Sequence, residues 1–275
     1  MKTSMQLKAL VRNLSKEKNV EAEIILRNFM LERFLERISV SKYRDNFILK
    51  GGMLITAMVG IDSRSTMDLD ATIKGQTLTE SEIVFIVCDI INITIDDGVI
   101  FTYRGIEEIR EEADYPGYRV SIGAVLDKTR QTLKIDITTG DFITPKEVTY
   151  NFKLLFENRS INILAYTIET VLAEKFETTI TRGIANSRMR DFYDIYILTK
   201  TQDINIAIFR EALKKTVEKR HTARQMSDIT SSINNISTND VMIELWTRYQ
   251  KKYNYAADTT WEMVVDAVKW LADNI

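Results

Sequence analysis

Three aspartates in the middle of the chain have the residue type and spacing for metal-assisted phosphoryl chemistry. Asp68 and Asp70 are separated by one residue in a strand-like run, so both carboxylates point to the same face of the strand. Asp136 lies in a second strand-like run, residues 133–138, where its two isoleucine neighbours face the opposite side. If the two strands are adjacent, the three carboxylates converge. Such a group suits two Mg²⁺ ions, because Mg²⁺ prefers oxygen ligands.

A glycine pair lies upstream of these carboxylates and adds weight to a pattern that is weak alone, since chance supplies about one Asp-x-Asp pair in such a chain. Lys50, Gly51 and Gly52 follow a short apolar run and precede a helical one. Glycines there let backbone N–H groups approach a phosphate, although a purely structural tight turn is the alternative. Arg64 and Thr66 offer a charge and a hydroxyl to a triphosphate, with a solvated loop as the alternative.

The composition excludes several other kinds of site. One cysteine rules out a disulfide framework and a cysteine-rich zinc site, and one histidine rules out motifs that need two. No apolar run approaches the roughly 20 residues of a membrane span. The first residues interrupt their apolar positions with charges and do not form a signal peptide. We therefore expect a cytoplasmic protein without a membrane partner.

Charge is unevenly distributed behind a net charge of −2. Residues 1–45 carry 10 basic and 6 acidic side chains, residues 46–145 carry 9 and 16, and residues 175–225 carry 11 and 6. The acidic middle contains the three aspartates, whose charge bound cations would offset. The basic flanks are where an anionic polymer such as RNA would lie.

The elements that must position these residues form a helical beginning and a β-rich middle. Apolar residues recur at helical spacing over residues 5–40. A further helix is predicted after a capping box from Thr79 to Glu82. The expected strands contain the runs Phe47–Lys50, Asp68–Lys74, Val99–Gly105, Tyr118–Leu126 and Thr132–Thr138.

After Pro145 the pattern is interpreted as helical to the end of the chain. The expected helices are Tyr166–Arg182, Arg190–Lys200, Asn205–His221, Asp240–Asn254 and Thr260–Ile275. This order predicts an α+β protein with two domains. Residues 1–145 would hold the N-terminal helices and the core, and residues 146–275 a helical C-terminal lobe.

The order and spacing of these motifs resemble the AbiEii/AbiGii toxin family. The matching motifs are Lys-Gly-Gly at 50–52, R-x-[ST]-x-D-L-D at 64–70, K-I-D-I at 134–137, a helical Lys175, and R-D-x-Y-D-I-Y at 190–196. The family consists of nucleotidyltransferase-fold proteins of bacterial type IV toxin–antitoxin and abortive-infection systems. The resemblance implies a mixed-sheet core like that of DNA polymerase β, with N-terminal helices and a C-terminal helical lobe.

The resemblance also implies roles for the residues of the middle segment. Gly51 and Gly52 match the glycine turn at the nucleotide phosphates, in the motif that begins with Lys50. Asp68 and Asp70 match the metal-binding carboxylates. Asp136 matches a third carboxylate that helps to activate the attacking hydroxyl.

Two helical motifs are assigned by the same resemblance. Lys175 matches the lysine that holds the phosphates of the incoming nucleotide. Asp191 matches the acidic residue of the later motif, with Asp194 as a close alternative. Without the family context, Lys175 is interpreted as a solvated charge. The two aspartates are then interpreted as ion-pair partners of Arg188 or Arg190.

The function that the resemblance implies is a toxin that transfers NMP from an NTP to an RNA, with two Mg²⁺ ions. The first-choice acceptor is the 3′ end of tRNA, whose modification would block translation and growth. The expected partner is an antitoxin of the winged-helix repressor type, not necessarily in contact with the toxin, and we expect a monomer. Two alternatives remain open: an NTP-binding (GTP-binding) regulator without catalysis, and a metal-dependent nuclease.

Overall fold

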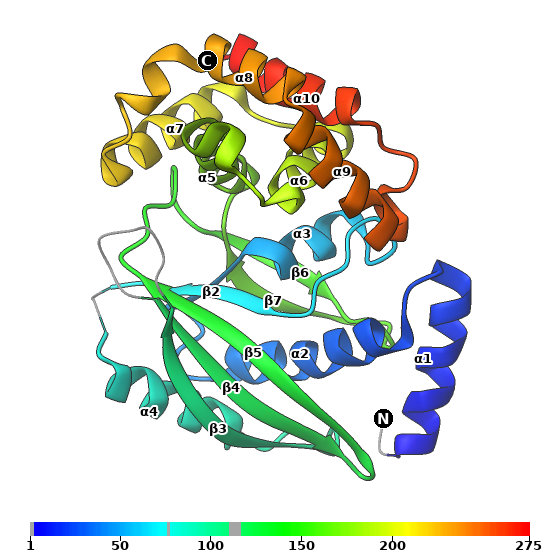
Figure 1. Cartoon of the computed structure of the whole chain (residues 1–275). Helices are drawn as coiled ribbons and strands as arrows, with labels where there is room; N and C mark the ends of the chain where they lie inside the picture. The colour runs from blue at the N-terminus through cyan, green and yellow to red at the C-terminus, as the bar shows by residue number, and fades with distance from the viewer. Residues whose placement is uncertain (1–2, 76–77, 110–116) are drawn as a thin grey trace. The chain divides into compact units, whose positions relative to one another are not determined.

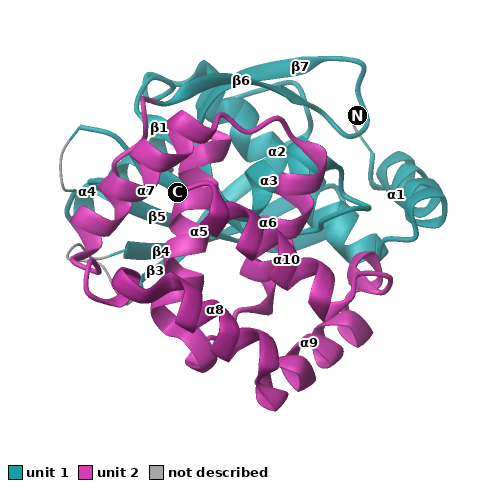
Figure 2. Ribbon diagram, turned by 90° about the horizontal axis from the view of Figure 1, so that it is seen from above, with its two compact units in different colours: residues 1–141, 147–165 teal, residues 142–146, 166–275 magenta. Residues whose placement is uncertain are grey.

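The computed structural model describes residues 3–75, 78–109 and 117–275, which form two compact units (Figure 2). Unit 1 comprises Met1–Asp141 and Glu147–Ala165, and unit 2 comprises Phe142–Lys146 and Tyr166–Ile275. Contacts therefore divide the chain near residue 165 rather than at the expected 145/146 boundary. Each unit is described here by itself.

Unit 1 is built on one seven-stranded mixed sheet with strand order β3-β4-β5-β2-β1-β7-β6. Neighbouring strands are antiparallel except for two parallel pairs, β1 with β7 and β2 with β5. The strands are β1 (Phe47–Lys50), β2 (Leu69–Ile73), β3 (Val99–Ile109), β4 (Gly117–Leu126), β5 (Thr129–Thr139), β6 (Val148–Lys153) and β7 (Ser160–Ala165).

Four helices complete unit 1: α1 (Ser4–Lys18), α2 (Ala22–Val40), α3 (Gly51–Val59) and α4 (Glu80–Ile91). Figure 1 shows α2 and α3 on opposite sides of the sheet at β2 and β7. The expected capping box is confirmed at the start of α4, where Thr79 and Glu82 each accept from the other's backbone N–H. The expected helical beginning is two helices, since Asn19 ends α1 in a left-handed conformation.

The strands form because their side chains alternate between a core and a polar face. In β5, Leu133, Ile135 and Ile137 are fully buried, whereas Lys134 is exposed and Asp136 is partly exposed. On the core face, Phe34 of α2 packs edge-on against Phe rings of β1 and β3, with ring centroids 6.5 and 6.1 Å apart. The polar face is left for the aspartates.

One expectation is wrong in this region, because the chain after Pro145 is not helical at once. Residues 148–165 form the hairpin of β6 and β7. The physical reason is a period of two: Phe152 of β6 and Ile161 and Ile163 of β7 are buried, whereas their neighbours Asn151, Lys153, Ser160 and Asn162 are exposed. This hairpin joins the sheet through β7 and so belongs to unit 1.

Unit 2 is helical, as expected. Its helices are α5 (Ile168–Arg182), α6 (Met189–Thr201), α7 (Ile206–Arg220), α8 (Ile229–Thr238), α9 (Asp240–Lys252) and α10 (Trp261–Asp273), with short 3₁₀ turns η1 (Gly183–Ala185), η2 (Gln225–Asp228) and η3 (Asn254–Ala256). Five of the six helices match the expected ones within two residues, and α8 was not predicted. Aromatic pairs hold the unit together, such as Phe176 with Phe209 at 6.1 Å and Phe192 with Trp261 at 5.3 Å. Within the described ranges, none of the helices has both the length and the apolar character that a membrane crossing requires.

Candidate active site

A row of charged side chains crosses four neighbouring strands on the polar face of the sheet. Lys50 of β1 lies opposite Asp70 of β2, Asp70 lies beside Asp136 of β5, and Asp136 lies opposite Arg119 of β4. Residues paired in this way project from the same face of a sheet. The expected adjacency of the two aspartate strands is therefore confirmed, and the site has basic groups at both ends.

The glycine turn at the start of α3 is built around Asp70. The Gly52 backbone N–H donates to Asp70 Oδ2 at 3.0 Å. Gly51 has a φ of +60°, and a Cβ added to it would lie 2.2 Å from the same oxygen. A residue other than glycine would thus be strained here and would displace the carboxylate. The turn holds Asp70 in place from the helix side.

Arg64 and Thr66 lie behind this turn and are almost completely buried, at 2% and 4% exposure. A Cβ on Gly52 would lie 2.6 Å from Thr66 Oγ1 and 2.9 Å from Arg64 Nη1. The Asn28 side chain of α2 donates to the Thr66 carbonyl oxygen at 2.8 Å and anchors the segment. These distances place Arg64 and Thr66 directly against the glycine turn, and their expected contact with a triphosphate stays a prediction.

Asp68 and Asp136 differ in the way their negative charge is compensated. Asp136 accepts two hydrogen bonds from Arg119, from Nε to Oδ1 and from Nη2 to Oδ2, both 2.8 Å long. Burial raises the pKa of Asp68 above its ordinary value, and the nearby carboxylates of Asp136 and Asp70 raise it further. Mutual repulsion of this kind is relieved by a bound cation.

Lys50 is directed toward a carboxylate that sequence reasoning missed. Its Nζ lies 2.8 Å from Asp141 Oδ2, and both side chains are 12% exposed. The Thr138 hydroxyl also donates to Asp141 Oδ2, at 2.7 Å. The pair lies at the C-terminal end of β5 and ties Lys50 to the strand that carries Asp136.

Arg119 was also missed, although a signal for it exists in the sequence. The β4–β5 hairpin has the two-residue loop Asp127–Lys128, with Leu126 opposite Thr129. Counting outward from that loop brings Arg119 opposite Asp136. Placing the loop correctly would have identified the pair, because loop length fixes hairpin register.

The expected helical residues form a second charged cluster in unit 2. Lys175 of α5 lies 2.7 Å from Asp191 and 2.9 Å from Asp194, both on α6. Arg188 contacts Asp191 at 2.7 Å. Burial lowers the pKa of Lys175, but the two carboxylates outweigh it, so the pKa is raised. Both acidic candidates therefore contact the lysine, and the solvated-charge interpretation of Lys175 is wrong.

The expected site residues thus fall into two groups. Lys50, the two glycines, Arg64, Thr66 and the three aspartates lie together in unit 1, and Lys175 with Asp191 lies in unit 2. That the two groups act at one site stays a prediction.

The fit of the site to a divalent cation is partial. Asp68 and Asp70 supply the oxygen ligands that Mg²⁺ prefers, and the raised pKa of Asp68 marks an excess of negative charge. Asp136 has both oxygens engaged by Arg119. Accordingly, no group of three or more His, Cys, Asp or Glu among the described residues is arranged to hold a metal ion. The site therefore has the oxygen ligands that a divalent cation prefers, but Asp136 is bound to Arg119.

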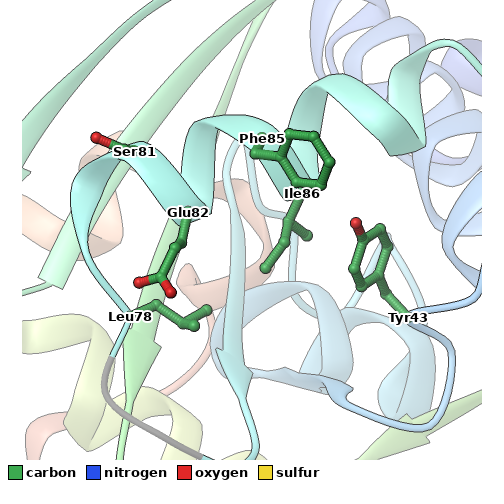
Figure 3. Close-up of a pocket in the computed structure, with 6 residues that line it drawn as sticks. All are labelled: Tyr43, Leu78, Ser81, Glu82, Phe85 and Ile86. Atoms are coloured by element: carbon green, nitrogen blue, oxygen red, sulfur yellow. The ribbon is translucent and has the colours of Figure 1, made fainter.

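A pocket elsewhere in unit 1 is distinct from this site (Figure 3). It has a volume of about 340 Å³ and lies at α4, lined by Tyr43, Leu78, Ser81, Glu82, Phe85 and Ile86. None of the expected site residues lines it.

Comparisons with known proteins give the family of the chain and agree with its fold. The family described as "Nucleotidyl transferase AbiEii toxin, Type IV TA system" matches residues 33–274. MenT4, a nucleotidyltransferase toxin of Mycobacterium tuberculosis H37Rv, has a similar structure, with a TM-score of 0.59, 15% identity, and 96% of this chain and 98% of that chain covered. JHP933 of Helicobacter pylori is also similar, with a TM-score of 0.55, 14% identity, and coverage of 92% and 91%.

A further H. pylori structure, described as a nucleotidyltransferase, has a TM-score of 0.54 at 14% identity and covers 92% of this chain and 95% of that chain. At such low identities these structures show the fold alone. No curated protein matches the sequence. The match to the family extends over most of the chain and includes all the motifs from Lys50 onward. The chain belongs to the AbiEii nucleotidyltransferase toxins of type IV toxin–antitoxin systems.

Proposed function

We propose that this toxin transfers a nucleoside monophosphate from an NTP to the 3′-hydroxyl of an RNA, with tRNA as the first-choice acceptor and Mg²⁺ as the required cation. The observation that carries the proposal is the convergence of Asp68, Asp70 and Asp136 beside the glycine turn that opens α3. A phosphoryl transfer needs carboxylates for cations and N–H groups for phosphates, and both lie at this point.

The three aspartates and the glycine turn of unit 1 have separate roles in this proposal. Asp68 and Asp70 would hold the cation, and Asp136 would serve as a third ligand once Arg119 leaves it. When bound, Mg²⁺ supplies positive charge that stabilises the attacking and leaving oxygens. The N-terminus of α3 has no side-chain cap from Lys50, so its remaining N–H groups and partial positive charge suit a triphosphate. Gly52 meanwhile keeps Asp70 in position.

In unit 2, we propose that Lys175 holds the phosphates of the NTP. Asp191 and Asp194 keep its side chain charged and extended in one direction, which lowers the entropy cost of binding. The basic ranges 1–45 and 175–225 supply the charge for an RNA backbone.

The direct test is incubation of the protein with each α-labelled NTP, Mg²⁺ and total RNA, followed by gel separation. Wild-type protein is expected to give a labelled band at tRNA size, and Asp68→Asn and Asp70→Asn are expected to give none. Asp62→Asn is the matched control, because Asp62 makes only an exposed ion pair with Lys18 at 3.4 Å in the connection before β2. A folded Asp68→Asn protein that labels RNA as well as wild type refutes the proposal.

The same gel separates the two alternatives. A nucleotide-binding regulator retains NTP on the protein and labels no RNA, and a nuclease shortens RNA. The three convergent carboxylates favour transfer over simple binding, since a binding module needs no such set. The glycine turn favours transfer over a nuclease, which has no triphosphate to hold.

For the antitoxin that the family implies, we propose a winged-helix repressor that opposes the toxin without a stable complex, and a monomeric toxin. Co-expression should restore growth of cells that produce the toxin, and the toxin alone should elute at its monomer mass of 31.8 kDa. A toxin that co-purifies with its antitoxin in fixed proportion contradicts this arrangement.

A further inference from the structure

We propose that Arg119 is a positioning residue that holds Asp136 away from divalent cations, and that Arg119 turns to Glu107 and leaves Asp136 to the cation when a cation binds. The inference rests on the proposed function, because it treats Asp136 as a cation ligand. Its first support is the two-point contact already described, in which Nε and Nη2 each donate to one oxygen of Asp136 at 2.8 Å. A carboxylate held by both oxygens has its best lone pairs occupied.

The geometry of this pair is fixed by the backbone. The two-residue loop of the β4–β5 hairpin holds Arg119 directly opposite Asp136. The side chains are 28% and 15% exposed, so the pair is less screened by solvent than an ordinary surface ion pair. Its positive charge also counters the repulsion at Asp68, whose pKa Arg119 lowers while the other two carboxylates raise it. Arg119 therefore neutralises part of the negative charge that a bound cation would otherwise neutralise.

A second carboxylate lies on the other side of Arg119. Glu107 of β3 is directly opposite Arg119 across the β3–β4 ladder, with its Oε1 3.9 Å from Arg119 Nη1. Glu107 is mostly exposed, and it is close enough to accept the guanidinium after a small rotation. An arginine between two carboxylates can leave one without losing an ionic partner.

A β-bulge is what places Glu107 there. The register of β3 against β4 shifts by one residue between Tyr103 and Gly105. Continuing the register that precedes the bulge would bring Ile106 opposite Arg119 and would turn Glu107 to the core face. The extra residue thus puts a carboxylate on the polar face at the one position where Arg119 can reach it. Figure 1 shows β3, β4 and β5 as the consecutive long strands that carry these three side chains.

The expected consequence concerns the order of cation binding. Asp68 and Asp70 take a first ion without disturbing Arg119, and a second ion must compete with the guanidinium for Asp136. Removing the arginine should therefore tighten binding of the competing ion. A charge-assisted hydrogen-bonded contact of this strength corresponds to about 10- to 100-fold in affinity.

The test is a Mn²⁺ titration of the full-length protein without NTP, followed by electron paramagnetic resonance of the free ion. Arg119→Gln is expected to tighten the weaker site by about 10- to 100-fold. The Mn²⁺ affinity of Arg119→Lys should lie between those of the wild type and Arg119→Gln, because an ammonium cannot make the two-point contact. Glu107→Gln should loosen the weaker site, because the released arginine then lacks its second partner. Arg130→Gln, which removes a charge from an exposed position of β5, is the matched control and should change little.

Unchanged or weaker Mn²⁺ binding in a folded Arg119→Gln protein overturns the proposal, as does an equal effect of Arg130→Gln. Adding Asp136→Asn to Arg119→Gln should abolish the gain, and a gain that persists also overturns it. Labelled transfer by the wild-type protein distinguishes the two claims. Transfer without the Mn²⁺ effect refutes only the role of Arg119, whereas the Mn²⁺ effect without transfer refutes only the proposed reaction.

Discussion

The glycine turn allows a sharp test of how the backbone positions Asp70. In Gly51→Ala, the added Cβ would lie 2.2, 2.6 and 2.7 Å from Oδ2, Cγ and Cβ of Asp70. Ordinary contacts begin near 3.4 Å. The carboxylate oxygen must therefore move by more than about 1 Å. Rotation of the Asp70 side chain cannot remove the clash, because the Asp70 Cβ is itself too close.

The free-energy cost of Gly51→Ala has two sources. A left-handed backbone costs an alanine about 1–2 kcal/mol. Displacing Asp70 breaks its hydrogen bond from the Gly52 N–H, a charge-assisted bond worth about 1.5–3 kcal/mol. The expected loss of unfolding free energy is thus about 2.5–5 kcal/mol. Nucleotide transfer should fall by about 100-fold or more, as expected for a reacting group misplaced by 1 Å.

Gly183→Ala is the matched control. Gly183 also has a positive φ, +52°, but nothing lies within 4 Å of its added Cβ. This variant should lose only the cost of placing an alanine in a backbone conformation that L residues rarely adopt, about 1–3 kcal/mol, and should keep its transfer activity. Urea unfolding gives the free energies, and labelled NTP gives the activities. If Gly51→Ala loses no more stability than Gly183→Ala, or stays active while folded, the account of the turn is wrong.

Three further changes probe buried charges. Burial raises the pKa of Glu32 from 4.5 to about 8, so the folded protein keeps a proton that the unfolded chain releases. The free energy of unfolding of the wild type therefore falls as pH rises from 4.5 to 8. Glu32→Gln should therefore gain up to about 3 kcal/mol relative to wild type between pH 4.5 and 7, and a difference independent of pH in urea unfolding contradicts this. Lys50→Met should lower the free energy of unfolding by about 3 kcal/mol, and Asp141→Asn as a second change should restore most of this loss. A double variant no more stable than Lys50→Met counts against the ion pair. Lys175→Met should cost about 3–5 kcal/mol by the same measurement, because two buried carboxylates lose one cationic partner that they share. A loss below about 1 kcal/mol is inconsistent with that contact.

The parts of the site that the sequence predicted are those set by local pattern. The alternation around Asp136 and the one-residue spacing of Asp68 and Asp70 determine which face each carboxylate takes, whatever the topology. The glycine pair was found because its conformation is a property of residues 51–52 themselves. Family resemblance then supplied the expectation of a mixed-sheet core and the roles of these residues, which spacing alone leaves open.

The parts that sequence reasoning missed depend on contacts between distant segments. Asp141 matters because Lys50, 91 residues away, reaches it. The hairpin at 148–165 is defined by pairing with β1, and short apolar runs there fit a helix or a strand equally well. The burial of Arg64 and Thr66 was missed for the same reason, since it depends on how α2 and α3 pack against them.

The place of β7 in the sheet has a consequence for synthesis of the toxin on the ribosome. Strand β1, which leads into the glycine turn, has β2 on one side and β7 on the other. A nascent chain that ends before residue 160 contains all the carboxylates of unit 1 but leaves the β7 edge of β1 open. An open central strand cannot hold its neighbours firmly. From the order of the strands we expect the site to assemble only after the β6–β7 hairpin has emerged from the ribosome.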